Sequence, residues 1–413
     1  MNSPQPIGLY LHVPFCASIC NYCNFNRGLF DGAAKARYVQ AMVREVRAVA
    51  DRLSSGVHPA TGLPVSGRAA PEAADTIYFG GGTPSLLSAD DVAALVDACR
   101  ASFRLAADAE VTLEANPETV TRESMAAYRA AGVNRVSLGV QSFRDEELRR
   151  LGRLHDAQRA VQAIEGTRAA GIANVSLDLM TWLPQQSVDD CLYSVGRLAS
   201  LAPTHASLYL LELYPNAPLR DEMARAGWSL APDEDAERMY LEARARLRDA
   251  GYVHYEISNF AQPGLESRHN LKYWSDGEWL AFGCGAHSTM AGVRWKNVSG
   301  RDAYVAAIEH DELPVTDDRR LTRLEQFQEA LFMGLRLTAG IDTDALQQRY
   351  GVDVRQQFGD RLARFEEAGL LVWEAVEGRF DDGVCRQLRL TPRGLLLSNE
   401  IMTVFLDDIG TVK

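Results

Sequence analysis

The sequence predicts an α/β fold: an incomplete (β/α)6 barrel followed by a small, mostly helical, winged-helix-like C-terminal domain. The first observation is that short β-rich runs alternate with Ala- and Arg-rich stretches of helical period, which is typical of βαβ units. The second is that six such repeats occur, and a full eight-unit barrel is the alternative. The third is that the pattern changes after about residue 319, where helices precede a β wing.

The predicted strands recur at regular intervals, and helices are predicted between them. The strands are 7–13, 76–79, 110–114, 135–140, 174–178 and 205–211. The helices are 34–53, 88–102, 121–131, 156–170 and 187–200. Parallel α/β sheets bind their ligands at the carboxyl ends of the strands, so we look for a site in the residues that follow each strand.

Composition changes predict three parts in the chain. Residues 1–230 form the barrel, with an exposed, mobile insertion at 54–74 that is rich in Gly, Pro, Ser and Ala. Residues 231–318 extend the barrel, and residues 319–413 form the C-terminal domain. Helices are predicted at 232–250, 324–337, 343–350, 354–368 and 392–406, and the wing strands at 370–374 and 387–390.

The composition excludes several classes of protein. Apolar content of 46% and charged content of 24% are those of a globular chain. No apolar run approaches the ~20 residues of a membrane span, and the N-terminus lacks the regions of a signal peptide, so we expect a cytoplasmic protein without an integral membrane segment. The net charge of −12 and the absence of a Lys/Arg block argue against a nucleic-acid partner.

Three cysteines near the start carry the strongest chemical signal. Cys16, Cys20 and Cys23 have the spacing C-x3-C-x2-C, and the next cysteine is Cys99. Three thiolates can hold three irons of a [4Fe–4S] cluster and leave the fourth iron open to a small-molecule ligand. A zinc site with His12 as fourth ligand and a disulfide framework are the alternatives, and both fit the spacing and the odd cysteine count less well.

The cysteine spacing resembles the signature of the radical-SAM superfamily, which binds S-adenosylmethionine (SAM) through the open iron. The resemblance extends over almost the whole chain and is closest to the oxygen-independent coproporphyrinogen III oxidase family, within it to the heme-chaperone branch. It implies a radical-SAM barrel. The matching motifs are LYLHVPFCASICNYCNFN, YFGGGTPSLLS, LEANPET, RVSLGVQSF, LGRLH, SLDLM, YEISNFAQPG, SRHNLKYW and FGCGAHS.

The resemblance implies a SAM site at the mouth of the barrel. Glycines let a ligand approach the backbone closely, and a carboxylate there needs a partner such as cationic SAM. The SAM contacts that the resemblance implies are Tyr10, Tyr22, Gly81, Gly82, Thr83 and Glu114.

A second SAM position is implied for Gln141, Arg153 and Asp178, although a structural ion pair between Arg153 and Asp178 is the alternative. The chain departs from the family here, because Trp182 and Gln185 stand where glycines are usual. These two larger side chains make the loop beside Asp178 bulkier.

A heme contact is implied by the motif H-N-x-x-Y-W, which comprises His269, Asn270, Tyr273 and Trp274. A histidine can ligate heme iron, and aromatic rings can cover a macrocycle face. The alternative is a structural histidine with its hydrogen bonds satisfied. Cys284, where the family tends to have proline, is an unassigned thiol in this region.

Three functions follow from the resemblance. The first is a heme chaperone that binds the cluster, SAM and heme or another porphyrin, and passes heme to an acceptor protein. An electron donor is a further partner, and the acceptor can be one that associates transiently with a membrane. The second is a coproporphyrinogen oxidase, but Phe25 replaces the extra cysteine of the oxidase branch. The third, a radical-SAM methyltransferase, is disfavoured by the C-terminal domain and the HNLKYW run.

Overall fold

The computed structural model describes residues 5–65, 72–377 and 384–406. Residue contacts divide the chain into two compact units. The first comprises Met1–Ala250 and Glu278–Arg319, and the second comprises Gly251–Gly277 and Arg320–Lys413. The second unit thus contains the HNLKYW segment. The division at 1–230, 231–318 and 319–413 stays a prediction.

The six predicted strands lie side by side and parallel in the sheet of the first unit, which confirms the predicted α/β barrel architecture. The sheet continues beyond β1 with four strands that the sequence did not predict. In the order in which they neighbour one another in the sheet, the six parallel strands are β1 (Ile7–Val13), β4 (Ala73–Gly81), β5 (Arg104–Ala115), β6 (Arg135–Gln141), β7 (Asn174–Thr181) and β8 (His205–Leu210). The four additional strands beyond β1 are β11 (Trp279–Phe282), β12 (His287–Met290), β13 (Val293–Asn297) and β14 (Val315–Arg320).

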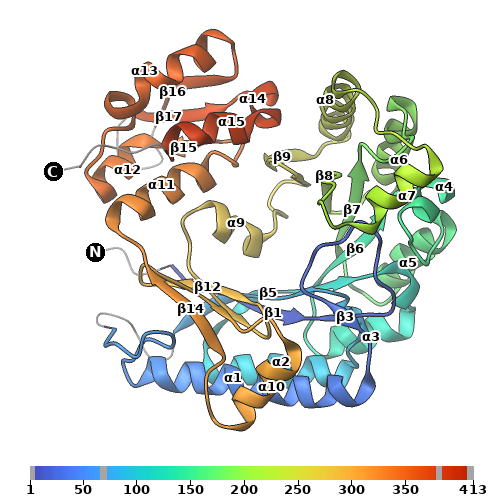
Figure 1. Ribbon diagram of the computed structural model, residues 1–413, viewed down its shortest axis with the longest axis vertical. Coiled ribbons are helices and arrows are strands. Elements are labelled where there is room, and N and C mark those ends of the chain that lie inside the picture. The colour runs from blue at the N-terminus through green and yellow to red at the C-terminus, as the bar shows by residue number, and fades with distance from the viewer. Residues whose placement is uncertain (1–4, 66–71, 378–383, 407–413) are drawn as a thin grey trace. The chain divides into compact units, whose positions relative to one another are not determined.

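Helices follow the strands and cover the outside of the sheet (Figure 1). Ser88, Thr121 and Ser187 each begin a helix with a capping box, in which a hydroxyl accepts a hydrogen bond from a first-turn backbone N–H. The helices are α1 (Gly32–Ser54), α2 (Ala89–Ser102), α3 (Arg122–Ala130), α4 (Asp145–Arg150), α5 (Ala157–Ala169), α6 (Val188–Leu201), α7 (Pro218–Ala226), α8 (Asp233–Asp249) and α10 (Arg301–Glu309).

The second unit combines helices with a three-stranded antiparallel sheet of order β15-β17-β16, as expected of a winged-helix-like domain. In its core the ring of Phe358 stacks on Phe327 and meets Phe405 edge to face. Its elements are β9 (Val253–Glu256), β10 (Asn259–Ala261), α9 (Arg268–Trp274), α11 (Arg323–Gly334), β15 (Ile341–Asp342), α12 (Thr343–Tyr350), α13 (Val354–Glu367), β16 (Leu371–Glu377), β17 (Val384–Leu390), α14 (Pro392–Leu396) and α15 (Ser398–Met402).

Two local predictions need correction or detail. The single helix predicted at 392–406 is wrong, because Leu397 has φ −103° and ψ 18°, outside the helical range, and separates α14 from α15. A 3₁₀ turn, Thr403–Phe405, follows. Part of the insertion predicted at 54–74, residues 66–71, lies outside the described residues. In the described part, the predicted exposure is wrong at His58, which is buried and packs edge-on against Trp295, with ring centroids 5.0 Å apart.

A glycine turn at the end of β4 packs directly against the exit of β1. Gly82 N donates to Val13 O (2.7 Å), and Thr83 N donates to Phe15 O (2.7 Å). A Cβ on Gly82 would lie 2.7 Å from Phe15 O and 2.8 Å from Val13 O, and one on Gly81, where φ is +112°, would lie 2.6 Å from the His12 ring. These glycines are therefore required by the packing of the chain against itself.

A buried carboxylate, Glu45 of α1, joins that helix to three other segments of the first unit. Its oxygens accept hydrogen bonds from Asn297 Nδ2 (2.5 Å), Tyr304 Oη (2.6 Å) and Gly283 N (2.8 Å). Burial raises the pKa of Glu45 to about 7, although these hydrogen bonds act in the opposite direction. Glu45 thus holds the β11–β13 region and α10 against α1.

We expect Gly82→Ala to destabilise the first unit by roughly 1–3 kcal/mol, because the new methyl group meets backbone oxygens that cannot rotate away. Urea denaturation of the purified chain measures the change. Gly32→Ala is the control, since a Cβ on Gly32 has no heavy atom within 4 Å. Equal stability of the two variants would contradict the packing argument.

Glu45 should make stability depend on pH. Its pKa is about 7 in the folded chain against 4.5 normally, so the folded state binds more protons between these values, and the free energy of unfolding falls as pH rises through them. Relative to Glu45→Gln, which does not titrate, the parent should lose about 3 kcal/mol between about pH 4.5 and about pH 7. Denaturation at several pH values measures this. A difference between the parent and Glu45→Gln that stays flat with pH would refute it.

Candidate functional site

The three cysteines lie on one loop that leaves β1. Cys16 ends the short strand β2 (Phe15–Cys16), which pairs with β3 (Gly28–Leu29), so the two ends of the loop are hydrogen-bonded side by side. Cys23 N donates to Cys20 O (3.3 Å) within the loop. Cys16 is buried, while Cys20 and Cys23 are half-buried. The structure therefore presents three thiols on a closed loop at the carboxyl end of the first strand.

Two asparagines tie the cysteine loop, residues 16–30, to distant parts of the first unit. Asn21 Nδ2 donates to Arg150 O (2.8 Å) and to Glu222 Oε2 (2.6 Å). Asn26 Nδ2 donates to Cys284 O (3.1 Å) and Ser299 O (3.0 Å). The loop is thus anchored to α4, α7 and the segments on either side of β12 and β13, which preorganises the three thiols.

His12 does not serve as a fourth ligand in this arrangement. Its Nε2 atom hydrogen-bonds Asn26 O (2.8 Å), and its Nδ1 atom lies 3.3 Å from Tyr10 Oη. Within residues 5–65, 72–377 and 384–406, no group of three or more His, Cys, Asp or Glu side chains is arranged to hold a metal ion. This disfavours a single-ion zinc site. In a [4Fe–4S] cluster each thiolate binds a different iron, so the sulfurs do not converge on one point.

The surroundings of the thiols suit an anionic group. Burial raises the pKa of Cys16 and of Cys23, while the charge of Arg27 acts to lower both, so a bound metal would favour the thiolate form against the effect of burial. The Nε–H groups of Arg27 and Arg153 are buried and have no hydrogen-bond partner among the described residues. An anion at the loop, such as a thiolate-bound cluster or a ligand carboxylate, would satisfy them.

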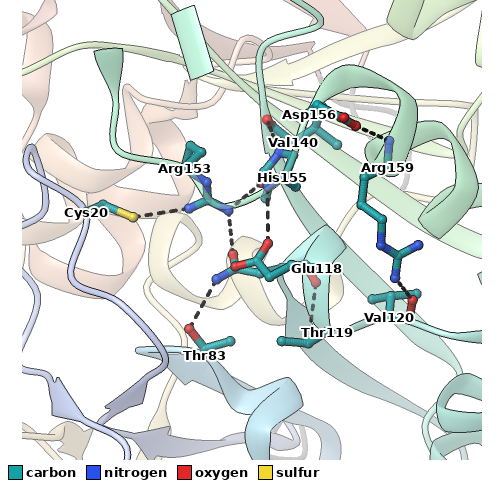
Figure 2. Close-up of polar contacts among 12 residues, drawn as sticks. Cys20, Thr83, Glu118, Thr119, Val120, Val140, Arg153, His155, Asp156 and Arg159 are labelled. Carbon is teal, nitrogen blue, oxygen red and sulfur yellow. Dashed lines mark hydrogen bonds and ion pairs between the residues drawn. The ribbon is translucent and has the colours of Figure 1, made fainter. Parts of the chain in front are cut away.

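Arg153 reaches from the LGRLH turn to the cysteine loop (Figure 2). Its Nη1 atom donates to Cys20 Sγ (3.4 Å) and lies 3.5 Å from Tyr22 Oη, and its Nη2 atom donates to Asn116 Oδ1 (2.7 Å) and Gly139 O (2.8 Å). These contacts, rather than an ion pair with Asp178, account for Arg153 in the part of the chain that the structure describes. The alternative of a structural Arg153–Asp178 pair is therefore not supported.

Glu114 lies at the end of β5 beside the glycine turn. It accepts hydrogen bonds from Tyr78 Oη (2.7 Å) and Gly81 N (3.2 Å). Burial raises the pKa of Glu114 to about 7, and the negative charge of Asp178 contributes to the rise. Tyr10 stacks on Tyr78 with centroids 6.1 Å apart. The predicted contacts Tyr10, Gly81 and Glu114 are thus brought together, and the carboxylate is poised to gain from a cationic ligand.

Asp178 is surrounded by hydroxyl groups from its own strand and the neighbouring strands. Its carboxylate accepts hydrogen bonds from Ser137 Oγ (3.0 and 3.1 Å) and Ser176 Oγ (3.3 Å), and it also hydrogen-bonds Ser207. Burial nevertheless raises the pKa of Asp178. Gln141, at the end of β6, has φ +69°, a strained conformation for a residue with a side chain.

The loop after β7 keeps a left-handed backbone without glycine. Trp182 and Gln185 both have φ +60°. Trp182 Nε1 donates to Ala231 O (2.8 Å), and Gln185 N donates to Ser229 O (2.9 Å). The backbone shape typical of glycine is thus retained at a cost of about 1 kcal/mol or more per residue, offset by bonds to the segment after α7.

The HNLKYW motif forms α9 in the second unit. His269 is buried, and its Nε2 atom lies 2.9 Å from Tyr273 Oη. Trp274 Nε1 is buried without a hydrogen-bond partner among the described residues, and Arg336 stacks over its ring at 5.3 Å. Asn270, Tyr273 and Trp274 are half-buried. A ligand acceptor near Trp274 would satisfy its N–H, and Tyr273 is the more exposed member of the His–Tyr pair.

Several residues of the site were not predicted from the sequence. Asn116 and Glu118 follow β5, and His155 follows Arg153; His155 Nδ1 lies 3.2 Å from Glu118 Oε2 and its Nε2 atom lies 3.0 Å from Val140 O. All three lie within the motifs LEANPET and LGRLH, so the motifs were the available signal. Only the fold shows that these two motifs meet.

Comparison with known proteins agrees with this geometry. The radical SAM superfamily model matches residues 65–195, and the HemN C-terminal domain model matches residues 321–377. Heme chaperone HemW of Bacillus subtilis is 33% identical over 402 residues, covering 97% of this chain and 99% of that protein. Heme chaperone HemW of Mycobacterium tuberculosis is 36% identical over 407 residues, with 97% and 95% covered.

Among solved structures, coproporphyrinogen III oxidase (HemN) from Escherichia coli, described as a radical SAM enzyme, superimposes with a TM-score of 0.79 at 22% identity. The match covers 97% of this chain and 90% of that one, and it confirms the fold. The relatives at 33–36% identity span nearly the full length of both chains. The chain therefore belongs to the heme chaperone HemW family of the radical SAM superfamily.

Proposed function

We propose that this chain binds a [4Fe–4S] cluster, SAM and heme in the cytoplasm and delivers heme to an acceptor protein. The single observation that carries the heme part is α9, where a His–Tyr pair adjoins a buried indole N–H that lacks a partner among the described residues. Relatives that match the chain over nearly its full length are named heme chaperones. Among the described residues, no helix is long and apolar enough to span a membrane.

The cluster would be held by Cys16, Cys20 and Cys23. Support comes from the anchored loop, from the orphaned guanidinium N–H groups beside it and from membership of the radical SAM superfamily. When bound, the cluster supplies an electron to a ligand on its open iron. An electron donor is therefore a further partner in the proposal. The protein's own residues hold the thiols at fixed positions and place Arg153 beside Cys20.

SAM would bind at the barrel mouth through Tyr10, Tyr22, Gly81, Thr83 and Glu114. The buried carboxylate of Glu114, which already accepts hydrogen bonds from Tyr78 and Gly81, is suited to a cationic amino group, and the glycine turn offers backbone groups. The packing of Gly82 against Phe15 O gives this residue a structural role beside the proposed contact. A second SAM is proposed at Gln141, Arg153 and Asp178. The Asp178 carboxylate there already accepts hydrogen bonds from serine hydroxyls.

Heme would contact His269, Asn270, Tyr273 and Trp274. Because His269 is buried and its Nε2 atom lies against the Tyr273 hydroxyl, His269 would bind iron only if that hydroxyl moved aside. Alternatively, Tyr273 itself ligates iron, as tyrosine does in some heme proteins, with His269 accepting its proton. The Trp274 N–H has no hydrogen-bond acceptor among the described residues, and a propionate carboxylate of heme would be a suitable acceptor.

SAM binding should depend on pH through Glu114. The pKa of this carboxyl is about 7, so its anionic form, which attracts a cation, grows as pH rises through that value. We expect the SAM affinity of the cluster-loaded protein to rise several-fold between about pH 6 and about pH 7.5. Equilibrium dialysis measures it. Glu114→Gln should bind SAM about tenfold more weakly at the upper pH and lose most of the pH dependence.

The matched control is Glu256→Gln in the second unit, because burial raises the pKa of Glu256 to about 7 as well. This variant should keep the parent's pH profile for SAM. The proposed role of Glu114 is wrong if Glu114→Gln and Glu256→Gln give the same profile and the same affinity.

Heme binding should require α9. We expect a Soret shift when heme is added to the purified chain, and a reduced or altered Soret band in His269→Ala and in Tyr273→Phe, because each removes one member of the pair. His310→Ala, an exposed histidine at the end of α10, is the control and should leave the spectrum unchanged. The reconstituted protein should not convert coproporphyrinogen III to protoporphyrinogen IX with SAM and reductant.

One result would contradict the chaperone function, and another would contradict the heme site at α9. Clear turnover of coproporphyrinogen without stable heme binding would restore the oxidase. Unchanged spectra in both α9 variants would place heme elsewhere in the chain.

A further inference from the structure

Asn116 occupies the centre of the site without being one of its predicted contacts. It follows β5 and precedes Pro117, which favours an extended conformation for the preceding residue; Asn116 has φ −95° and ψ 140°. Its Oδ1 atom accepts a hydrogen bond from Arg153 Nη2 (2.7 Å), and its Nδ2 atom donates to Thr83 Oγ1 (3.2 Å). The amide therefore bridges two residues that come from different ends of the sequence.

Both residues that Asn116 contacts go on to contact a cysteine. Arg153 Nη1 donates to Cys20 Sγ (3.4 Å), and the Thr83 hydroxyl hydrogen-bonds the Cys16 side chain. Figure 2 shows Arg153 between Cys20 and the Glu118–His155 pair, with Thr83 below them. A continuous chain of hydrogen bonds thus runs Cys16–Thr83–Asn116–Arg153–Cys20.

The chemistry of the groups fixes the direction of each bond. A guanidinium can only donate, so the atom of Asn116 that faces Arg153 must be Oδ1, and Nδ2 must face Thr83. Thr83 Oγ1 then accepts from Asn116, which leaves the Thr83 proton free to point at Cys16 Sγ. Both arms of the chain consequently end in a donor directed at sulfur.

We propose that Asn116 is a positioning residue for the cluster, which aims the Thr83 hydroxyl at Cys16 and the Arg153 guanidinium at Cys20. Hydrogen bonds and positive charge at cluster sulfurs stabilise the reduced, more negative state and so raise the reduction potential. The role requires the cluster but neither SAM nor heme. It therefore stands or falls independently of heme delivery.

The test is a redox titration of the reconstituted cluster without SAM, followed by electron paramagnetic resonance of the reduced state. Asn116→Leu keeps the approximate volume and removes both hydrogen bonds. We expect it to hold four irons but to shift to lower potential. The reduced-to-oxidised ratio at the parent's midpoint should fall several-fold; a tenfold fall corresponds to ~59 mV for a one-electron couple.

Asn174→Leu is the matched control. Asn174 Oδ1 also accepts a hydrogen bond from a threonine hydroxyl, Thr204 Oγ1 (2.9 Å), but it begins β7 at the opposite end of the strands from the cysteine loop. This variant should keep the parent's potential. A pure effect of packing or stability would shift both leucine variants alike, and that result would overturn the proposal.

Thr83 supplies a second, gentler pair of variants. Thr83→Val removes the hydroxyl and should lower the potential, whereas Thr83→Ser keeps it and should restore the parent's value. If Asn116→Leu fails to hold a cluster, the comparison of the Thr83→Val and Thr83→Ser potentials is the test by itself. Equal potentials for these two variants would overturn the proposal. A parent-like potential in a cluster-loaded Asn116→Leu would overturn it directly.

Discussion

Two backbone hydrogen bonds between the end of β4 and the exit of β1 fix the geometry of the whole mouth of the barrel. Gly82 N and Thr83 N donate to Val13 O and Phe15 O, so the glycine turn and the base of the cysteine loop form one rigid unit. The turn must be glycine because a Cβ would overlap those same carbonyl oxygens. Gly81 in turn donates to Glu114, and Thr83 accepts from Asn116, so the third strand is aligned by the same contact.

Charge is distributed unevenly around that unit. The carboxylates Glu114 and Asp178 both have raised pKa values because they are buried, and they lie on the side of β5 to β7. The guanidinium groups of Arg27 and Arg153 lie beside the cysteines. One side of the mouth therefore favours a cation and the other favours an anion. A zwitterionic ligand with separated charges, or an anionic cluster next to a cationic ligand, would fit this arrangement of charge.

The sequence predicted well those features that depend on local pattern. The six parallel strands overlap the predicted ranges because each contains a short apolar run between helical stretches, although β5 begins at Arg104, well before the predicted residue 110. Cysteine spacing identified the loop. The sequence could not show that Asn21 reaches Glu222, or that Asn116 joins Arg153, because the partners are 201 and 37 residues apart and only the folded sheet brings them together. Strand β11 was missed because its apolar run is only four residues long, and β12–β14 were missed because they are short and mostly polar.

The anchors of the cysteine loop also impose an order on biosynthesis. The thiols emerge from the ribosome first, but their side-chain ties come from Arg150, Glu222 and Ser299, between 129 and 273 residues later. At roughly 5–20 residues per second, that interval lasts on the order of ten seconds to a minute. During this time the cysteines are neither positioned nor shielded. The ordered geometry of the three thiols is consequently available to a metal only after α7 and the β13 region have been made.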